Sequence, residues 1–193
     1  MDNLARLVEE IRACRLCEQH LPLGANPVVR GTKKARILIV GQAPGVRVHN
    51  SGLPFDDPSG DRLRQWLGVD RETFYNEDNF AIFPMGFCYP GTRQGGDLPP
   101  RPECAQTWRQ RLHKNLENIE LTLLFGKYAL NYYLPETRHQ PLTQTVQDWQ
   151  KYQPHYLPMP HPSPRNIRWF KANPWFEEQV IPHLKQQVKP LLD

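Results

Sequence analysis

The sequence predicts an α/β fold in which helices cover both faces of a four-stranded, mostly parallel sheet, giving three α/β/α layers in a single domain, residues 1–193. Four short apolar runs predict the strands, and helix-like stretches separate them, as in parallel βα units. The first run contains Ile37-Leu38-Ile39-Val40, which is apolar on both faces, as a strand buried between two layers must be. A length of 193 residues fits one domain with one proper core.

The strands are expected at 36–40, 79–83, 121–126 and 155–159. Helices are expected at 2–13, at 59–67 with Ser59 as the cap, and at 105–118, 127–134 and 142–152. A last helix begins at Asn173-Pro174, with Pro182 as an irregularity within it. Glycine and proline mark 18–35 and 84–104 as loops.

The composition is that of a folded chain, with 39% hydrophobic and 23% charged residues. A net charge of +4 is compatible with nucleic acid but does not demonstrate that the chain binds it. No run approaches the 18 or more apolar residues of a membrane span. The first residues are acidic and then amphipathic, which differs from a secretory signal. We therefore expect a cytoplasmic monomer that makes no membrane contact.

The four cysteines form one pattern: Cys14-x2-Cys17, Cys88 and Cys104. Stable disulfides are disfavoured in a cytosolic chain. A C-x2-C pair brings two thiolates within reach of one metal centre, and the other two cysteines would complete a four-thiolate site. Coordination chemistry alone leaves structural zinc and an iron–sulfur cluster open. The alternative is four unrelated buried cysteines.

Polar loops follow the predicted strands. Gly41-Gln42-Ala43-Pro44-Gly45 follows the first strand, and His161-Pro162-Ser163-Pro164-Arg165-Asn166 follows the last. In an open α/β sheet, ligands bind at the carboxyl ends of the strands, so these loops predict a site. Phe55, after Pro54 in a polar loop, suits either a platform for base stacking or a plug in the core. Each loop taken alone is equally an ordinary turn.

Taken together, these motifs resemble the uracil-DNA glycosylase superfamily. The resemblance is carried by Gly41-Gln42-Ala43-Pro44-Gly45, Gly52-x-Pro54-Phe55 and His161-Pro162-Ser163, and covers roughly residues 1–185. The cysteine spacing is similar to that of the iron–sulfur branch called family 4. The string His-Pro-Ser-Pro-Arg-Asn is closer to the single-strand-selective monofunctional branch, so the chain looks like a mosaic of the two.

The resemblance implies a monofunctional DNA glycosylase that flips uracil, or a related deaminated base, out of DNA and excises it by hydrolysis, leaving an abasic site for base excision repair. Uracil-containing DNA is then the partner. The resemblance also implies a structural [4Fe–4S] cluster. Its ligands would be Cys14, Cys17, Cys88 and Cys104.

The same resemblance assigns roles to the loop residues. His161 is implied as the donor to the uracil O2 while negative charge builds there, and Gln42 as the second catalytic residue. Phe55 is implied to stack on the flipped base. Expected substrate contacts also include Gly41, Ala43, Met85 and Gly86. Expected DNA contacts are Ser163, Pro164, Arg165 and Arg168, with Lys171 nearby.

The chain departs from the family pattern at two places. Family 4 has a glutamate where this chain has Gln42, and another branch has an aspartate where it has Ala43. Relatives carry an asparagine at the end of the second strand, where the spacing gives Pro84; we expect backbone groups of Met85 and Gly86 to replace it. Carboxylates nearby in sequence are Asp56, Asp57 and Asp61, which we interpret as solvated loop residues.

Two other functions stay open. The missing carboxylates favour a non-catalytic module that binds damaged or single-stranded DNA through the same pocket. The cysteines also suit a redox-sensing iron–sulfur protein with a vestigial pocket. A second basic group precedes the first strand and is interpreted as a solvated charged stretch: Arg30, Lys33, Lys34 and Arg36.

Overall fold

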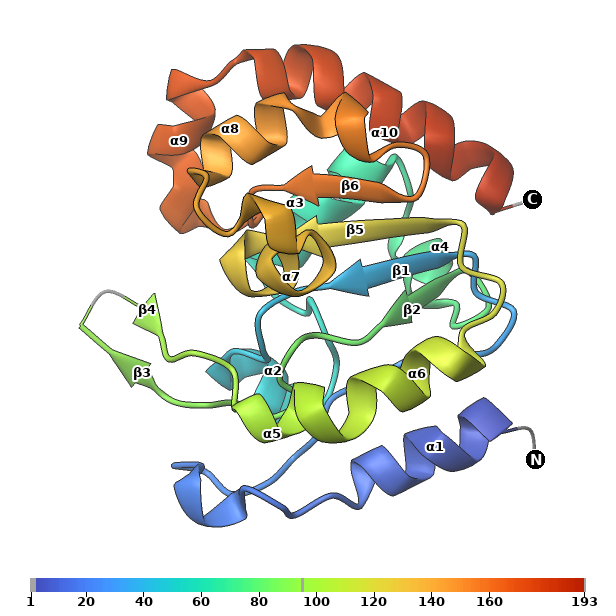
Figure 1. The fold of residues 1–193 in the computed structure, drawn as a ribbon, viewed down its shortest axis with the longest axis vertical. Coiled ribbons are helices and arrows are strands. Elements are labelled where there is room, and N and C mark those ends of the chain that lie inside the picture. The colour runs from blue at the N-terminus through green and yellow to red at the C-terminus, as the bar shows by residue number, and fades with distance from the viewer. Residues whose placement is uncertain (1–2, 95, 193) are drawn as a thin grey trace.

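The computed structural model describes residues 3–94 and 96–192. A four-stranded sheet with the order β2-β1-β5-β6 lies at its centre, and every neighbouring pair of strands is parallel (Figure 1). The strands are β1 (Ile37–Val40), β2 (Phe80–Ile82), β5 (Leu121–Phe125) and β6 (Tyr156–Met159). The predicted α/β fold class with a mostly parallel sheet is confirmed, and an isolated antiparallel bridge joins Arg30 to Ile82 of β2.

Alternate residues of each strand enter different cores, because successive side chains point to opposite faces of a sheet. In β1, Leu38 and Val40 belong to one buried cluster, and Ile37 and Ile39 to the other. Each face of the sheet therefore carries its own apolar layer, and Leu142 packs against both clusters.

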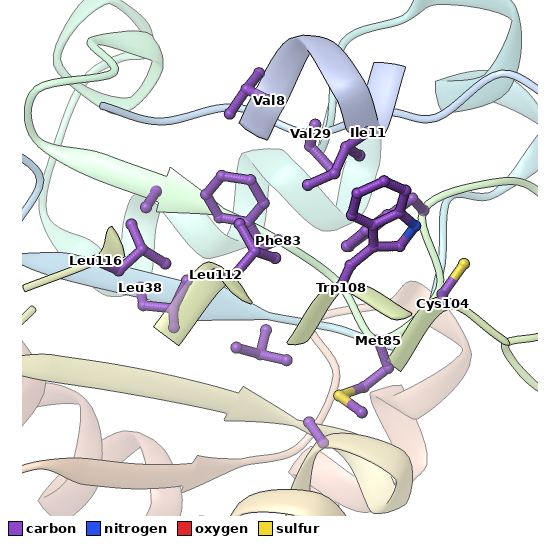
Figure 2. Packing of buried hydrophobic residues seen from close by; sticks show 14 of the residues in the cluster. Val8, Ile11, Val29, Leu38, Phe83, Met85, Cys104, Trp108, Leu112 and Leu116 are labelled. Carbon is purple, nitrogen blue, oxygen red and sulfur yellow. The ribbon is translucent and has the colours of Figure 1, made fainter. Parts of the chain in front are cut away.

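Helices cover both faces. The first cluster packs α1 (Asn3–Arg12), α6 (Gln110–Asn115) and α7 (Gly126–Tyr133) against the sheet, and part of it is shown in Figure 2. The second cluster uses α3 (Pro58–Leu67), α4 (Arg71–Tyr75), α9 (Ile167–Ala172) and α10 (Ile181–Val188). The remaining helices are α2 (Val46–Ser51), α5 (Pro102–Cys104) and α8 (Leu142–Gln147).

Several element boundaries differ from the sequence prediction. Asp57, not Ser59, caps α3: its carboxylate accepts the Gly60 N–H at 2.9 Å, and Pro58 takes the first helical position, where a missing N–H costs nothing. The predicted helix 105–118 begins earlier, at α5, and continues through a π-helical turn, Ala105–Arg109, into α6. The predicted helix 142–152 divides into α8 and a 3₁₀ turn, Trp149–Tyr152.

The loop expected at 84–104 contains a small antiparallel hairpin, β3 (Thr92–Arg93) and β4 (Gly96–Asp97). Figure 1 shows it projecting beyond the carboxyl ends of the parallel strands, which is where the candidate site lies. Two-residue strands carry no readable alternation, so the pattern did not predict them. None of the described helices has the length and apolarity needed to span a membrane.

Candidate functional site

A cavity of about 400 Å³ opens at the carboxyl end of β1, a volume within the range of small-molecule sites. The structure brings the loop after β1, the Phe55 loop and the loop after β6 together in its wall, as the sequence predicted. The predicted site residues that line it are Gly41, Gln42, Ala43, Phe55, His161, Ser163, Pro164 and Arg165. Met85, Gly86 and Arg168 do not belong to this lining.

The backbone N–H groups of Met85 and Gly86, residues that we expect to contact the substrate, donate hydrogen bonds within the protein. The Met85 N–H donates to the Gly41 carbonyl and the Gly86 N–H to the Gln42 carbonyl, both at 2.9 Å. The Met85 side chain is 5% exposed and packs in the first core cluster (Figure 2). These two N–H groups therefore hold the loop after β1 in place and are not free to donate to a base.

Pro84 lines the cavity but offers no hydrogen bond to a base edge from its main chain. Proline has no N–H. Its carbonyl accepts a hydrogen bond from Arg109, which is 1% exposed and also donates to the Phe83 carbonyl at 3.0 Å. The Pro84 carbonyl, at the position where the resemblance implies an asparagine, is therefore already bonded to a buried guanidinium.

The Gln42 side chain is anchored on the hairpin. Its Nε2 donates to the Leu98 carbonyl at 2.8 Å and, more weakly, lies 3.4 Å from the Asp97 carbonyl. Because both partners are acceptors, the amide must turn its nitrogen toward them. Its Oε1 is therefore the end left to accept a hydrogen bond from another donor.

His161 has a defined tautomer. Its Nδ1 accepts the Ser163 N–H at 3.1 Å, so the ring proton of the neutral imidazole resides on Nε2. Burial lowers the pKa of His161, and the nearby Asp57 and Asp97 partly oppose that shift. Asn166 donates to the His161 carbonyl at 2.8 Å and fixes the loop. The site therefore presents a neutral N–H donor at neutral pH.

Phe55 packs against the core and also lines the cavity. Its ring packs edge-on against Phe74, with 6.1 Å between centroids, and nearly parallel to His161, at 6.4 Å. It adopts a positive φ of 57°, which is uncommon for a bulky residue. Gly60 permits this bend, because a Cβ there would lie 1.7 Å from the Phe55 carbonyl oxygen. The ring therefore packs against the second core cluster on one side and lines the cavity on the other.

Arg62, which the sequence analysis did not select, tethers the His161 loop. Its Nη1 donates to the carbonyls of Pro162 and Ser163 at 3.2 and 3.4 Å. Its guanidinium also lies 4.9 Å from the centre of the Phe170 ring. No local motif marks such a contact, since Arg62 and the loop are 100 residues apart.

The loop carboxylates divide into two groups. Asp56 pairs with Arg71 at 2.8 Å and Asp61 with Arg64 at 2.6 Å, and neither lines the cavity. Asp57 does line it, as does Asp97 of β4. The interpretation of the three loop carboxylates as solvated is therefore wrong for Asp57. The sequence analysis did not identify Asp97 as a site residue.

The two basic groups also separate. A Cβ at Gly96 would lie 3.1 Å from Nη1 of Arg165, so this guanidinium lies against the hairpin at the cavity. Arg168 and Lys171 are exposed on α9. The group before β1 makes ion pairs instead, as a solvated charged stretch does: Arg30–Glu77 at 3.1 Å, Lys34–Asp78 at 3.0 Å and Arg36–Glu120 at 2.7 Å.

The cysteines are free thiols rather than disulfides. Cys17 and Cys88 share one buried cluster, and Cys104 follows at the end of α5. Burial, with a smaller contribution from neighbouring cysteines, raises the pKa of Cys88 to about 12 and that of Cys104 to about 11. The four thiols thus lie near one another, although no set of three metal-ligating side chains among the described residues has the spacing of a metal site.

The fold and these loops agree with the comparison to known families. The family model described as "Uracil DNA glycosylase superfamily" matches residues 28–185. The chain belongs to this superfamily. The matched residues include all three loops of the cavity wall, whereas Cys14 and Cys17 precede them.

Curated relatives named type-4 uracil-DNA glycosylase align over 137 residues, 68% of this chain. The relative from Archaeoglobus fulgidus is 29% identical and covered over 64% of its length. Those from Saccharolobus solfataricus and Sulfurisphaera tokodaii are 26% and 27% identical and covered over 59% and 58%. The chain therefore spans less than two thirds of the length of these relatives.

Proposed function

We propose that this member of the superfamily is a monofunctional DNA glycosylase that hydrolyses the N-glycosidic bond of uracil, or of a related deaminated base, flipped out of DNA. The single observation that carries the proposal is the neutral His161, with its proton on Nε2, in the wall of a cavity of about 400 Å³ that Phe55 also lines. The names of the relatives support uracil as the base.

The chemistry requires a donor at the departing base. As the bond between the sugar C1′ and the base nitrogen breaks, its electron pair moves onto the base, and uracil leaves as an anion. An N–H aimed at the uracil O2 stabilises this charge most in the transition state, which accelerates the step. A neutral imidazole suits this task, because its proton stays on the ring. No lysine is among the described residues of the cavity wall, which supports excision without a lyase step.

DNA would reach the cavity past Ser163, Pro164 and Arg165. Pro162 and Pro164 stiffen this loop, and Arg62 holds its carbonyls from behind. A stiff loop can hold a duplex open at little entropic cost. Arg165 and Arg168 would contribute phosphate contacts, whose strength depends on salt.

A structural [4Fe–4S] cluster on Cys14, Cys17, Cys88 and Cys104 is part of the proposal. Free thiols that lie near one another suit a cationic centre, because four neighbouring thiolates would repel each other until a metal neutralises them. The sulfur atoms would need to converge further to bind it. When bound, the cluster supplies a cross-link between the N-terminal segment and α5 rather than a chemical step.

The proposal is tested by base release from labelled oligonucleotides that carry one uracil, hypoxanthine or xanthine, in single and double strands. Alkali then cleaves at abasic sites. Cleavage at uracil that disappears in His161→Ala supports the proposed enzyme. DNA binding without release of any base would instead support the non-catalytic binding module.

A further inference from the structure

We propose that Asp97 is a catalytic residue, which supplies from the β3–β4 hairpin the carboxylate that the loop after β1 lacks. The inference rests on the proposed glycosylase function. Bond breaking leaves positive charge on the sugar, and a neighbouring anion stabilises it. In the loop after β1, Gln42 and Ala43 offer only an amide and a methyl group.

The Asp97 carboxylate is placed beside the loop after β1. It lines the same cavity as Gln42 and His161, and its Oδ2 lies 3.9 Å from the position of a Cβ on Gly45. Across residues 3–94 and 96–192 the structure gives this carboxylate no hydrogen bond and no ion pair. It is therefore available to hold a water molecule or to face a sugar.

The Gln42 amide explains how the hairpin is held there. Its Nε2 contacts the carbonyls of Asp97 and Leu98, and the Leu98 N–H donates to the Gly91 carbonyl at 2.8 Å. A glutamate at position 42 would turn a carboxylate oxygen toward these carbonyls, which would repel it. The two residues thus act together: the Gln42 amide holds the hairpin in place, and the hairpin positions the Asp97 carboxylate in the cavity wall.

Asp57 is the competing carboxylate, and its geometry suits it less. One of its oxygens accepts the Gly60 N–H at 2.9 Å and caps α3, so it already has a structural task. Asp97 has no such task in the described structure. An anion in the wall of a DNA-binding cavity also repels phosphates, so it weakens binding of the ground state. That penalty is compensated if the charge acts on the cationic transition state.

The step balances as a hydrolysis. Water, held between the Asp97 carboxylate and the Gln42 Oε1, adds its oxygen to C1′ while the bond from C1′ to the base breaks. The electron pair of that bond goes to the base, which takes up a proton after it leaves. The proton lost by the water passes to the Asp97 carboxylate and then to solvent.

The test is single-turnover base release from uracil-containing DNA by Asp97→Asn, with DNA affinity measured on the same protein by fluorescence anisotropy. We expect the rate to fall by about 10²–10⁴-fold, the usual contribution of such a group, while DNA binding stays equal or tightens because an anion is removed. Asp56→Asn is the matched control, since Asp56 lies outside the cavity and pairs with Arg71.

The outcomes separate the two proposals. A wild-type protein that releases no base overturns the proposed function and this inference together. A wild-type protein that releases uracil while Asp97→Asn keeps its rate within threefold overturns the inference alone. A fall in rate matched by weaker DNA binding would show a structural role for Asp97 and also overturn it.

Gln42→Glu gives a second, independent test. We expect it to be slower than wild type, because the new carboxylate loses the contact with the hairpin carbonyls. A Gln42→Glu enzyme that is faster than wild type would place the carboxylate at position 42 and contradict the assignment to Asp97.

Discussion

Removing the imidazole of His161 should slow chemistry without weakening DNA binding. Its Nδ1 is occupied by the Ser163 N–H, so the ring offers one donor to a base, the Nε2–H. Loss of one donor at a developing anion costs about 10²–10³ in rate, or about 2.7–4 kcal/mol of transition-state stabilisation. We therefore expect His161→Ala to lose base release by that factor, with DNA affinity within about twofold of wild type.

The assay is single-turnover release of uracil from labelled DNA, with affinity measured by anisotropy at the same salt concentration. His155→Ala is a suitable control, because His155 is exposed at the opposite end of β6 and outside the cavity. An equal loss of release and of binding in His161→Ala would refute the assigned role, since it would show that the ring positions DNA rather than stabilising the leaving base.

Four further outcomes are expected. Arg165→Ala should weaken DNA binding and reduce the slope of log affinity against log salt by about one, which a salt titration measures; an unchanged slope would exclude a phosphate contact. Cys14→Ala should lose iron and visible absorption and unfold at a lower temperature, whereas a colourless but active wild-type protein would refute the cluster. Gly60→Ala should destabilise the fold by about 1–3 kcal/mol or more in denaturant titrations, because its Cβ would lie 1.7 Å from the Phe55 carbonyl oxygen; a neutral effect would contradict that geometry. Burial lowers the pKa of His161, so below about pH 6.5 the unfolded chain binds more protons than the folded chain. The free energy of unfolding is therefore highest above about pH 6.5 and decreases as the pH falls. The His161→Ala variant should show a flatter dependence of the free energy of unfolding on pH.

The sequence by itself determined the sheet and the place of the site. Strands buried on both faces show continuous apolar runs, so β1 and β5 are readable without any tertiary information. The loops after β1 and β6 meet because parallel strands bring their carboxyl ends to one edge. Gln42, Phe55 and His161 were therefore predictable as neighbours in the cavity wall.

The tertiary structure alone decided which polar groups are free. The sequence gives no sign that the N–H groups of Met85 and Gly86 donate to the loop after β1, and only the structure shows these hydrogen bonds. Asp97 lies in a two-residue strand without periodicity, and its approach to Gln42 joins positions 55 residues apart. Such contacts join segments that are far apart in the sequence and form only once the sheet has assembled. Local sequence propensities therefore do not predict them.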